Sequence, residues 1–167
     1  MKRCVVFSML VVFAMLSWFS SGCGGTSAVA PRVDAWAPGF TLPTLYGETV
    51  TLSELRGQPV LLTFWATWCR YCRHQMPYLQ AAFEEKGQEV KFIAIDIGES
   101  SGTVKQYIED MGLSFTVALD RNRSVTSAYN IRYFPTTFLV DEQGVIKSIR
   151  LGAFMSKDEL MAMLEGL

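Results

Sequence analysis

Two cysteines separated by two residues, Cys69 and Cys72, constrain this chain more than any other feature. They follow the apolar run Leu61–Trp68, which predicts a buried strand that leads directly into a helix. Residues three apart on a helix lie on one face about 5–6 Å apart, so two such cysteines can close a disulfide with little movement. The unpaired N–H groups and the positive dipole end of a helix start also stabilise a thiolate. The spacing therefore predicts a bond that can be made and broken.

Two other uses of this pair have to be weighed. A permanent stapling disulfide would add little stability, because closing so short a loop removes little chain entropy. A tetrahedral zinc site needs further ligands, and beyond residue 22 the sequence offers one histidine, His74, and no second cysteine pair. We therefore expect no metal site here.

The first 22 residues have the features of a secretory signal. A basic start, Lys2-Arg3, precedes the uncharged and mostly apolar run Val5–Phe19, which is followed by the small residues Ser20-Ser21-Gly22. So short a run at the extreme N-terminus is typical of a signal peptide rather than a membrane span. We predict a signal peptide at 1–22, a tether at 23–32 and a single domain at 33–167.

The small residues before Cys23 resemble the lipobox of bacterial lipoproteins, in which the cysteine is lipidated and becomes the mature N-terminus. Ser20 departs from that pattern, which prefers leucine at this position. The resemblance implies lipidation at Cys23 and a lipid anchor; ordinary cleavage nearby and an uncleaved anchor are the alternatives. We expect the domain to lie outside the cytoplasm, in the periplasm or on the outer face of the membrane.

Charge and cysteine usage narrow the function classes. Removal of the signal takes Lys2 and Arg3 from the 15 basic residues and none of the 16 acidic ones, which leaves a net charge of −3. This balance gives no reason to expect nucleic-acid binding. Cys4 leaves with the signal, and lipidation would consume Cys23. The remaining two of the four cysteines exclude a framework of several disulfides.

Apolar runs alternate with amphipathic segments from residue 49 to the end of the chain. The first kind predicts strands at 49–52, 60–66, 90–97, 115–119, 136–140 and 145–151. The second kind predicts helices at 70–86, 103–111, 124–129 and 157–164. This alternation, with a closing hairpin, predicts an α/β fold with a mixed central sheet and helices on both faces.

Capping and helix-breaking residues mark several boundaries. Ser156 and Glu159 have capping-box spacing before the last helix, and Ser53 is expected to cap a helix after the first strand. Gly112 is expected to end the second helix, and Pro77 to kink the first.

Six motifs occur in a fixed order along the chain. They are Ala37-Pro38-Gly39-Phe40, Leu55-Arg56-Gly57-Gln58-Pro59-Val60, Phe64-Trp65-Ala66-Thr67-Trp68-Cys69, Met76-Pro77, Ile97-Gly98-Glu99-Ser100 and Phe134-Pro135-Thr136-Thr137-Phe138. By this ordered set the chain resembles the thioredoxin superfamily, and specifically its TlpA/ResA-like extracytoplasmic branch. The resemblance implies a thioredoxin-like fold with a central helix–strand insertion, here at about 98–119.

The resemblance also implies thiol–disulfide exchange at Cys69 and Cys72, facing a cis-proline that the motif places at Pro135. A cis bond would hold the backbone of Phe134 exposed, where an extended substrate segment could pair with it. We expect Cys69 to occupy the first helical position and to attack, and Cys72, one turn deeper, to resolve the mixed disulfide.

Four neighbours are candidates for tuning or substrate contact. Trp68 is expected to form an apolar rim beside the cysteines, and Arg70 to favour the thiolates and so make the disulfide more oxidising. Tyr71 stands where many relatives carry proline; it either packs beside the site or is a solvated helix residue. His74 lies off the face that the cysteines share, as a solvated histidine or a pH-tuning group.

Two departures from the pattern of these families concern proton transfer. Thr63 replaces a buried aspartate that is common in thioredoxins, and Gln75 replaces a glutamate that is common in this branch. Neither side chain titrates, so a proton for Cys72 must come from water, a thiol or another acid. Other candidate acids, which we expect to be turn or surface carboxylates, are Glu48, Asp96 and Glu99.

We therefore predict an extracytoplasmic thiol–disulfide oxidoreductase that acts on protein substrates. In the relatives it usually reduces other proteins' disulfides, including apocytochrome c during cytochrome c maturation, with electrons from a membrane protein. The resemblance implies these partners and no cofactor beyond the Cys69–Cys72 disulfide. Because Arg70 favours an oxidant, the direction of electron flow stays open.

Two other function classes compete with this prediction. The Ala37-Pro38-Gly39-Phe40 opening is shared with peroxiredoxins, but the residues before Cys69 do not fit their Pro-x-x-x-Thr/Ser-x-x-Cys pattern. Copper-binding relatives pair their cysteines with a distant histidine, and none follows His74.

Overall fold

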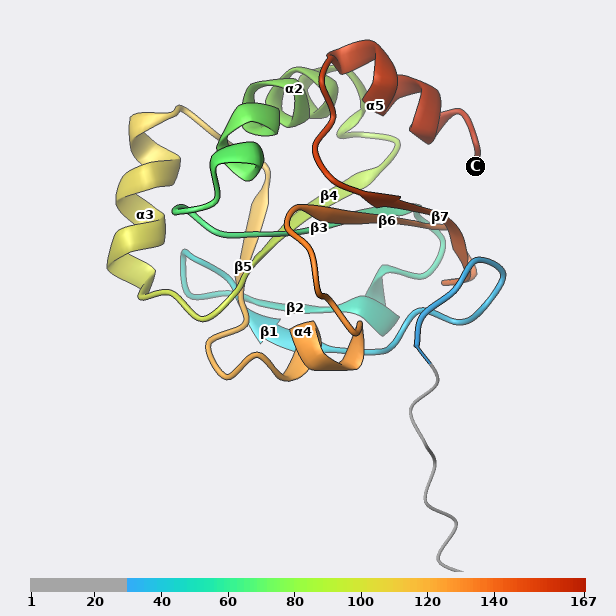
Figure 1. The fold of residues 1–167 in the computed structure, drawn as a ribbon. Coiled ribbons are helices and arrows are strands. Elements are labelled where there is room, and N and C mark those ends of the chain that lie inside the picture. Colours follow the sequence, from blue (N-terminus) through green and yellow to red (C-terminus); the bar gives the residue numbers. More distant parts are fainter. Residues whose placement is uncertain (1–29) are drawn as a thin grey trace, which may run out of the picture.

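A five-stranded mixed sheet forms the centre of the protein (Figure 1). The computed structural model describes residues 30–167, so the predicted signal peptide at 1–22, Cys23 and most of the predicted tether at 23–32 lie outside the described residues. The strand order is β5-β4-β3-β6-β7, with β3, β4 and β5 parallel and β6 antiparallel to both β3 and β7. The predicted mixed sheet is confirmed.

The central strand β3 (Val60–Trp65) is buried along its whole length, as expected of a strand covered on both faces. The other strands of this sheet are β4 (Lys91–Asp96), β5 (Thr116–Leu119), β6 (Thr136–Val140) and β7 (Ile146–Leu151). A separate antiparallel ribbon consists of β1 (Thr41–Pro43) and β2 (Thr49–Thr51).

Helices cover both faces of the sheet, as predicted. The helices are α2 (Arg70–Lys86), α3 (Ser101–Asp110), α4 (Ser124–Ala128) and α5 (Lys157–Leu164), with the 3-10 helix η1 (Leu52–Leu55) after β2. Helices α2 and α5 lie together on one face, and α4 lies with the β1–β2 ribbon on the other (Figure 1). Helix α3 and strand β5 stand between β4 and α4 in the chain, where the resemblance placed an insertion.

Cap geometry explains which predicted boundaries hold. The Ser156 hydroxyl accepts the Glu159 N–H at 3.2 Å, so α5 begins at Lys157 as predicted. The prediction for Ser53 is wrong: this residue lies inside η1, whose N-cap Thr51 makes no side-chain cap bond.

Helix α3 begins two residues before its predicted start, because Ser100 caps it by accepting the Thr103 N–H at 3.2 Å. Gly112 ends the helix as predicted: at φ +62° its N–H bonds to the Glu109 carbonyl, while the Leu113 N–H reaches Ile108. Helix α2 continues through Pro77. No helix formed by residues 30–167 has the length and apolar character needed to cross a bilayer.

Candidate active site

Cys69 and Cys72 are joined by a disulfide where β3 leads into α2, with their Cα atoms 5.2 Å apart. Cys69 is the N-cap of α2 and not its first helical residue, which corrects the sequence-based prediction. Its backbone is extended, with φ −78° and ψ 109°, and its sulfur accepts the Cys72 N–H at 3.1 Å. The sulfur thus occupies the place of a capping oxygen, where the helix start favours negative charge.

The two cysteines differ in their exposure to solvent. Cys69 retains 7% of its surface exposed, whereas Cys72 is completely buried one turn further along α2. A partner molecule can therefore approach the disulfide from the Cys69 side. This asymmetry suits an attacking Cys69 and a resolving Cys72.

Two aromatic side chains form a rim that begins at Trp68, the residue before Cys69. Trp68 is 63% exposed, and its ring meets that of Phe134 edge to face with the centroids 6.1 Å apart. The Phe134–Pro135 peptide bond is cis, and the next residue, Thr136, pairs with Phe64 of β3. Contact between the two aromatic rings brings the proline loop beside the loop that carries Cys69.

A surface groove of about 500 Å³ runs beside this rim. Trp68 and Phe134 line it together with Ile97 and the side chain of Arg123, which comes from the loop before α4. The groove therefore combines apolar walls with polar ones, which come from Arg123, Thr126, Ser127 and Asn130. Such a mixed lining beside the proline loop suits an extended peptide segment.

The other predicted neighbours lie on the exposed part of α2. Tyr71 is 64% exposed, which agrees with the alternative of a solvated helix residue. Arg70 lines a surface hollow together with Arg73 and His74. His74 is exposed and meets the ring of Tyr78 edge to face. The structure thus groups Arg70 with other basic side chains on the outer surface of the helix.

The two departures, Thr63 and Gln75, belong to one buried and uncharged hydrogen-bond network. The Gln75 amide donates to the Thr63 hydroxyl at 3.1 Å, and that hydroxyl bonds with the Thr137 hydroxyl at 3.0 Å. The backbone N–H of Phe154 donates to the Gln75 carbonyl oxygen at 3.3 Å. The two positions at which the resemblance implied titrating acids therefore hold a neutral network, in which the hydroxyl and amide groups find partners without ionising.

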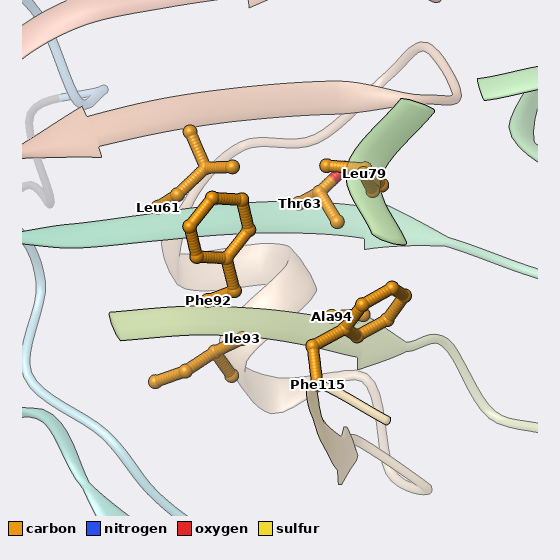
Figure 2. A pocket seen from close by; sticks show the side chains of 7 residues that line it. All are labelled: Leu61, Thr63, Leu79, Phe92, Ile93, Ala94 and Phe115. Atoms are coloured by element: carbon orange, nitrogen blue, oxygen red, sulfur yellow. The ribbon is translucent and has the colours of Figure 1, made fainter. Parts of the chain in front are cut away.

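A small cavity of about 10 Å³ adjoins Thr63, a member of this network (Figure 2). Figure 2 shows Thr63 pointing toward α2, beside Leu79, while the remaining walls come from apolar side chains such as Phe92 and Phe115. One hydroxyl gives a trapped water too few hydrogen-bond partners, so this space is a gap in core packing. Within residues 30–167 no group of three or more histidine, cysteine, aspartate or glutamate side chains is arranged to hold a metal.

The candidate acids differ sharply in their surroundings. Glu48 is exposed in a turn, as predicted, and Glu99 is half-buried. The prediction for Asp96 is wrong, because this residue ends β4 with its side chain fully buried. Burial, and to a smaller extent the neighbouring Glu99 side chain, raises the pKa of Asp96 to about 8.

Residues 33–149 match the AhpC/TSA family. The chain is 38% identical to the thiol-disulfide oxidoreductase ResA of Geobacillus kaustophilus over 143 residues, which cover 85% of this chain and 82% of that one. It is 33% identical to ResA of Bacillus subtilis, over 86% of this chain and 81% of the relative.

Solved structures agree with these relatives. A secreted Mycobacterium tuberculosis disulfide oxidoreductase homologous to Escherichia coli DsbE superposes with a TM-score of 0.71 at 27% identity. The match covers 77% of this chain and 96% of that structure. With the disulfide at the start of α2 and the thioredoxin-like sheet, the chain belongs to the AhpC/TSA family and is a ResA-like thiol–disulfide oxidoreductase of the thioredoxin superfamily.

Proposed function

We propose that this oxidoreductase reduces disulfides in other proteins outside the cytoplasm, through Cys69 and Cys72. The observation that carries the proposal is the unequal burial of a disulfide placed at a helix start: Cys69 is partly accessible and Cys72 is enclosed. This arrangement gives one sulfur for attack and a second that meets the first without competing for the substrate.

The exchange proceeds in two balanced steps. The Cys69 thiolate attacks one sulfur of the substrate disulfide, forms a mixed disulfide and releases the other substrate sulfur as a thiolate. Cys72 then loses its proton and attacks the Cys69 sulfur, which forms the Cys69–Cys72 disulfide and releases the second substrate sulfur. Two electrons pass from the dithiol to the substrate, and two protons pass to its thiols. The dithiol supplies the electrons itself, so the exchange requires no further cofactor.

The groove beside Trp68 and Phe134 is the proposed docking site for the substrate. An extended segment that pairs with the backbone at Phe134 and Pro135 would present its cysteine to Cys69, while its apolar side chains contact the aromatic rim. Apocytochrome c is the proposed substrate, as in cytochrome c maturation, and a membrane protein is the proposed electron donor that regenerates the dithiol.

The proposed location is the outer face of a membrane, with Cys23 lipidated. Its supports are the signal-like residues 1–22 and the likeness to a secreted oxidoreductase. In a bacterial host, we expect the mature protein to carry an acylated N-terminal Cys23 by mass spectrometry and to fractionate with membranes. A Cys23→Ala variant should lose both properties. A mature N-terminus downstream of Cys23 in the parent protein would contradict lipidation.

The reduction potential tests the direction of electron flow. We expect equilibration with glutathione or dithiothreitol to give a value closer to that of thioredoxin, about −270 mV, than to that of DsbA, about −120 mV. The difference in reduction potential between an Arg70→Gln variant and the wild type measures the effect of the positive charge that follows Cys69 in the sequence. A potential near that of DsbA would instead identify an oxidant.

A further inference from the structure

The Glu99 carboxyl contacts the loop that carries Cys69, and a second carboxyl, that of Asp96, bonds to the Glu99 backbone. The Glu99 carboxylate accepts two bonds from Thr67, one from its backbone N–H and one from its hydroxyl, each 2.6 Å long. Thr67 lies two residues before Cys69, whose own N–H bonds to the Ala66 carbonyl at 3.2 Å. Glu99, which lies 32 residues after Thr67 in the sequence, therefore restrains the turn 66–69 through its side chain.

This contact is strongest with an ionised Glu99. Both carboxylate oxygens can then accept from Thr67, whereas a protonated carboxyl could keep the contact only by donating to the Thr67 hydroxyl, without the gain from the negative charge. Charge-assisted bonds of this length are the strong class of hydrogen bond.

The second carboxyl, Asp96, lies beneath Glu99. One of its oxygens accepts the Glu99 backbone N–H at 3.1 Å. The other oxygen is buried and has no partner among residues 30–167. An ionised Asp96 would leave one oxygen of a buried carboxylate without a donor, beside a second negative charge, whereas a protonated Asp96 carries no buried charge.

The charged and titratable groups around the pair come from three elements. The Arg123 side chain crosses Gly98, where a Cβ atom would lie 2.8 Å from the guanidinium Nε; Gly98 has φ +84°. Asp120, after β5, donates its N–H to the Asp96 carbonyl, but its carboxylate is used by Val125 and Thr126 at the start of α4. Tyr107 of α3 packs on Trp65, the β3 residue that pairs with Asp96.

We propose that Glu99 is a positioning residue for Cys69, and that Asp96 keeps Glu99 ionised by holding the proton that the two carboxyl groups would otherwise contest. While Asp96 is protonated, Glu99 fixes Thr67 and the turn that presents the Cys69 sulfur. When Asp96 ionises, the two negative charges repel and the hold on Thr67 loosens. The proposal rests on the proposed function, because its consequence is a rate of disulfide exchange.

The test measures how fast the reduced protein reduces oxidised glutathione between pH 5 and 10. For the wild type we expect the rate to rise as the thiol ionises and then to fall below that trend, by about threefold to tenfold, as Asp96 titrates. Asp96→Asn keeps an oxygen for the Glu99 N–H and cannot ionise, so its profile should follow the thiol alone. Glu99→Gln should lower the rate about threefold at every pH, since its amide can keep both contacts with Thr67 but without the strengthening by a negative charge.

Two further measurements separate positioning from simple destabilisation. Hydrogen exchange at the Thr67 amide should accelerate at high pH, beyond its intrinsic pH dependence, in the wild type but not in Asp96→Asn. Thr67→Val removes one donor and should reproduce part of the Glu99→Gln effect, which also covers the case in which Glu99→Gln fails to fold. Glu109→Gln, at an exposed carboxylate of α3, is the matched control and should behave as wild type.

Identical pH profiles for wild type and Asp96→Asn, or an unchanged rate in both Glu99→Gln and Thr67→Val, would overturn the proposal. Thr67 exchange does not depend on catalysis, so it distinguishes this outcome from a failure of the proposed exchange function itself.

Discussion

The Cys72→Ser variant is expected to accumulate mixed disulfides between Cys69 and its protein substrates. In the wild type, Cys72 stands 5.2 Å away by Cα and resolves such an adduct from inside the protein. A serine hydroxyl cannot displace a thiol, so the intermediate should persist until an external thiol attacks it. Cys69 is the more accessible cysteine and forms the adduct. We expect the lifetime of this mixed disulfide to increase by roughly a thousandfold or more. Non-reducing electrophoresis after acid quenching measures the amount of mixed disulfide, and mass spectrometry of the adducts identifies the substrates.

Matched variants decide whether the trapped species reflects the proposed mechanism. Cys69→Ser leaves a buried Cys72, so it should form few adducts, and the double variant should form none. Equal trapping by Cys69→Ser and Cys72→Ser would contradict the assigned roles. If Cys72→Ser forms no covalent adducts in the native cell envelope, the exchange function itself is wrong.

The regular elements were predictable from sequence because local pattern and tertiary environment agree. The bounds of α2 and α5 follow from residues within each helix or next to it, such as the Ser156 cap. The predicted strands extend up to one residue beyond the observed ones at several ends. The reason is that Val90, Ile97 and Phe115 are apolar and buried, yet stand outside the ladders. Hydrophobicity identifies burial, whereas a strand end depends on backbone pairing.

In the site, too, features set by local spacing were predictable, whereas features set by tertiary contacts were not. Spacing alone placed Cys69 and Cys72 on one side of a helix start, and the disulfide between them agrees. The hydrogen bonds between Glu99 and Thr67 join residues 32 apart in the sequence, and no local sequence pattern indicates them. Glu99 was a candidate acid because of its residue type, and its partner could be found only once the β3 and β4 ends were placed side by side.

Asp96 shows why a residue's type is a poor guide to its burial. An aspartate followed shortly by a glycine is typical of an exposed turn, and most carboxylates are exposed. Here the pairing of Asp96 with Trp65 continues the sheet to its last residue and carries the side chain into the interior. The unusual protonation of this acid follows from that placement.

The folded protein is expected to lose stability as the pH rises from 5 to 8, and Asp96→Asn should abolish most of this loss. Burial, with a further contribution from Glu99, raises the pKa of Asp96 from an ordinary 3.8 to about 8. Between these values the folded protein retains a proton that the unfolded chain has lost, so a higher pH favours unfolding. One such group can lower the free energy of unfolding by roughly 1 kcal/mol per pH unit, levelling off above the folded pKa.

Urea unfolding of the oxidised protein at pH 5, 6, 7 and 8 measures this effect. The free energy of unfolding of Asp96→Asn should exceed that of the wild type by an amount that grows with pH, because the difference cancels the groups that titrate in both proteins. Asp110→Asn, an exposed carboxylate at the end of α3, should instead run parallel to the wild type. A constant difference between Asp96→Asn and wild type would show that Asp96 does not hold its proton in the folded state. The carboxylate would then have to be stabilised by a donor that reaches its second oxygen.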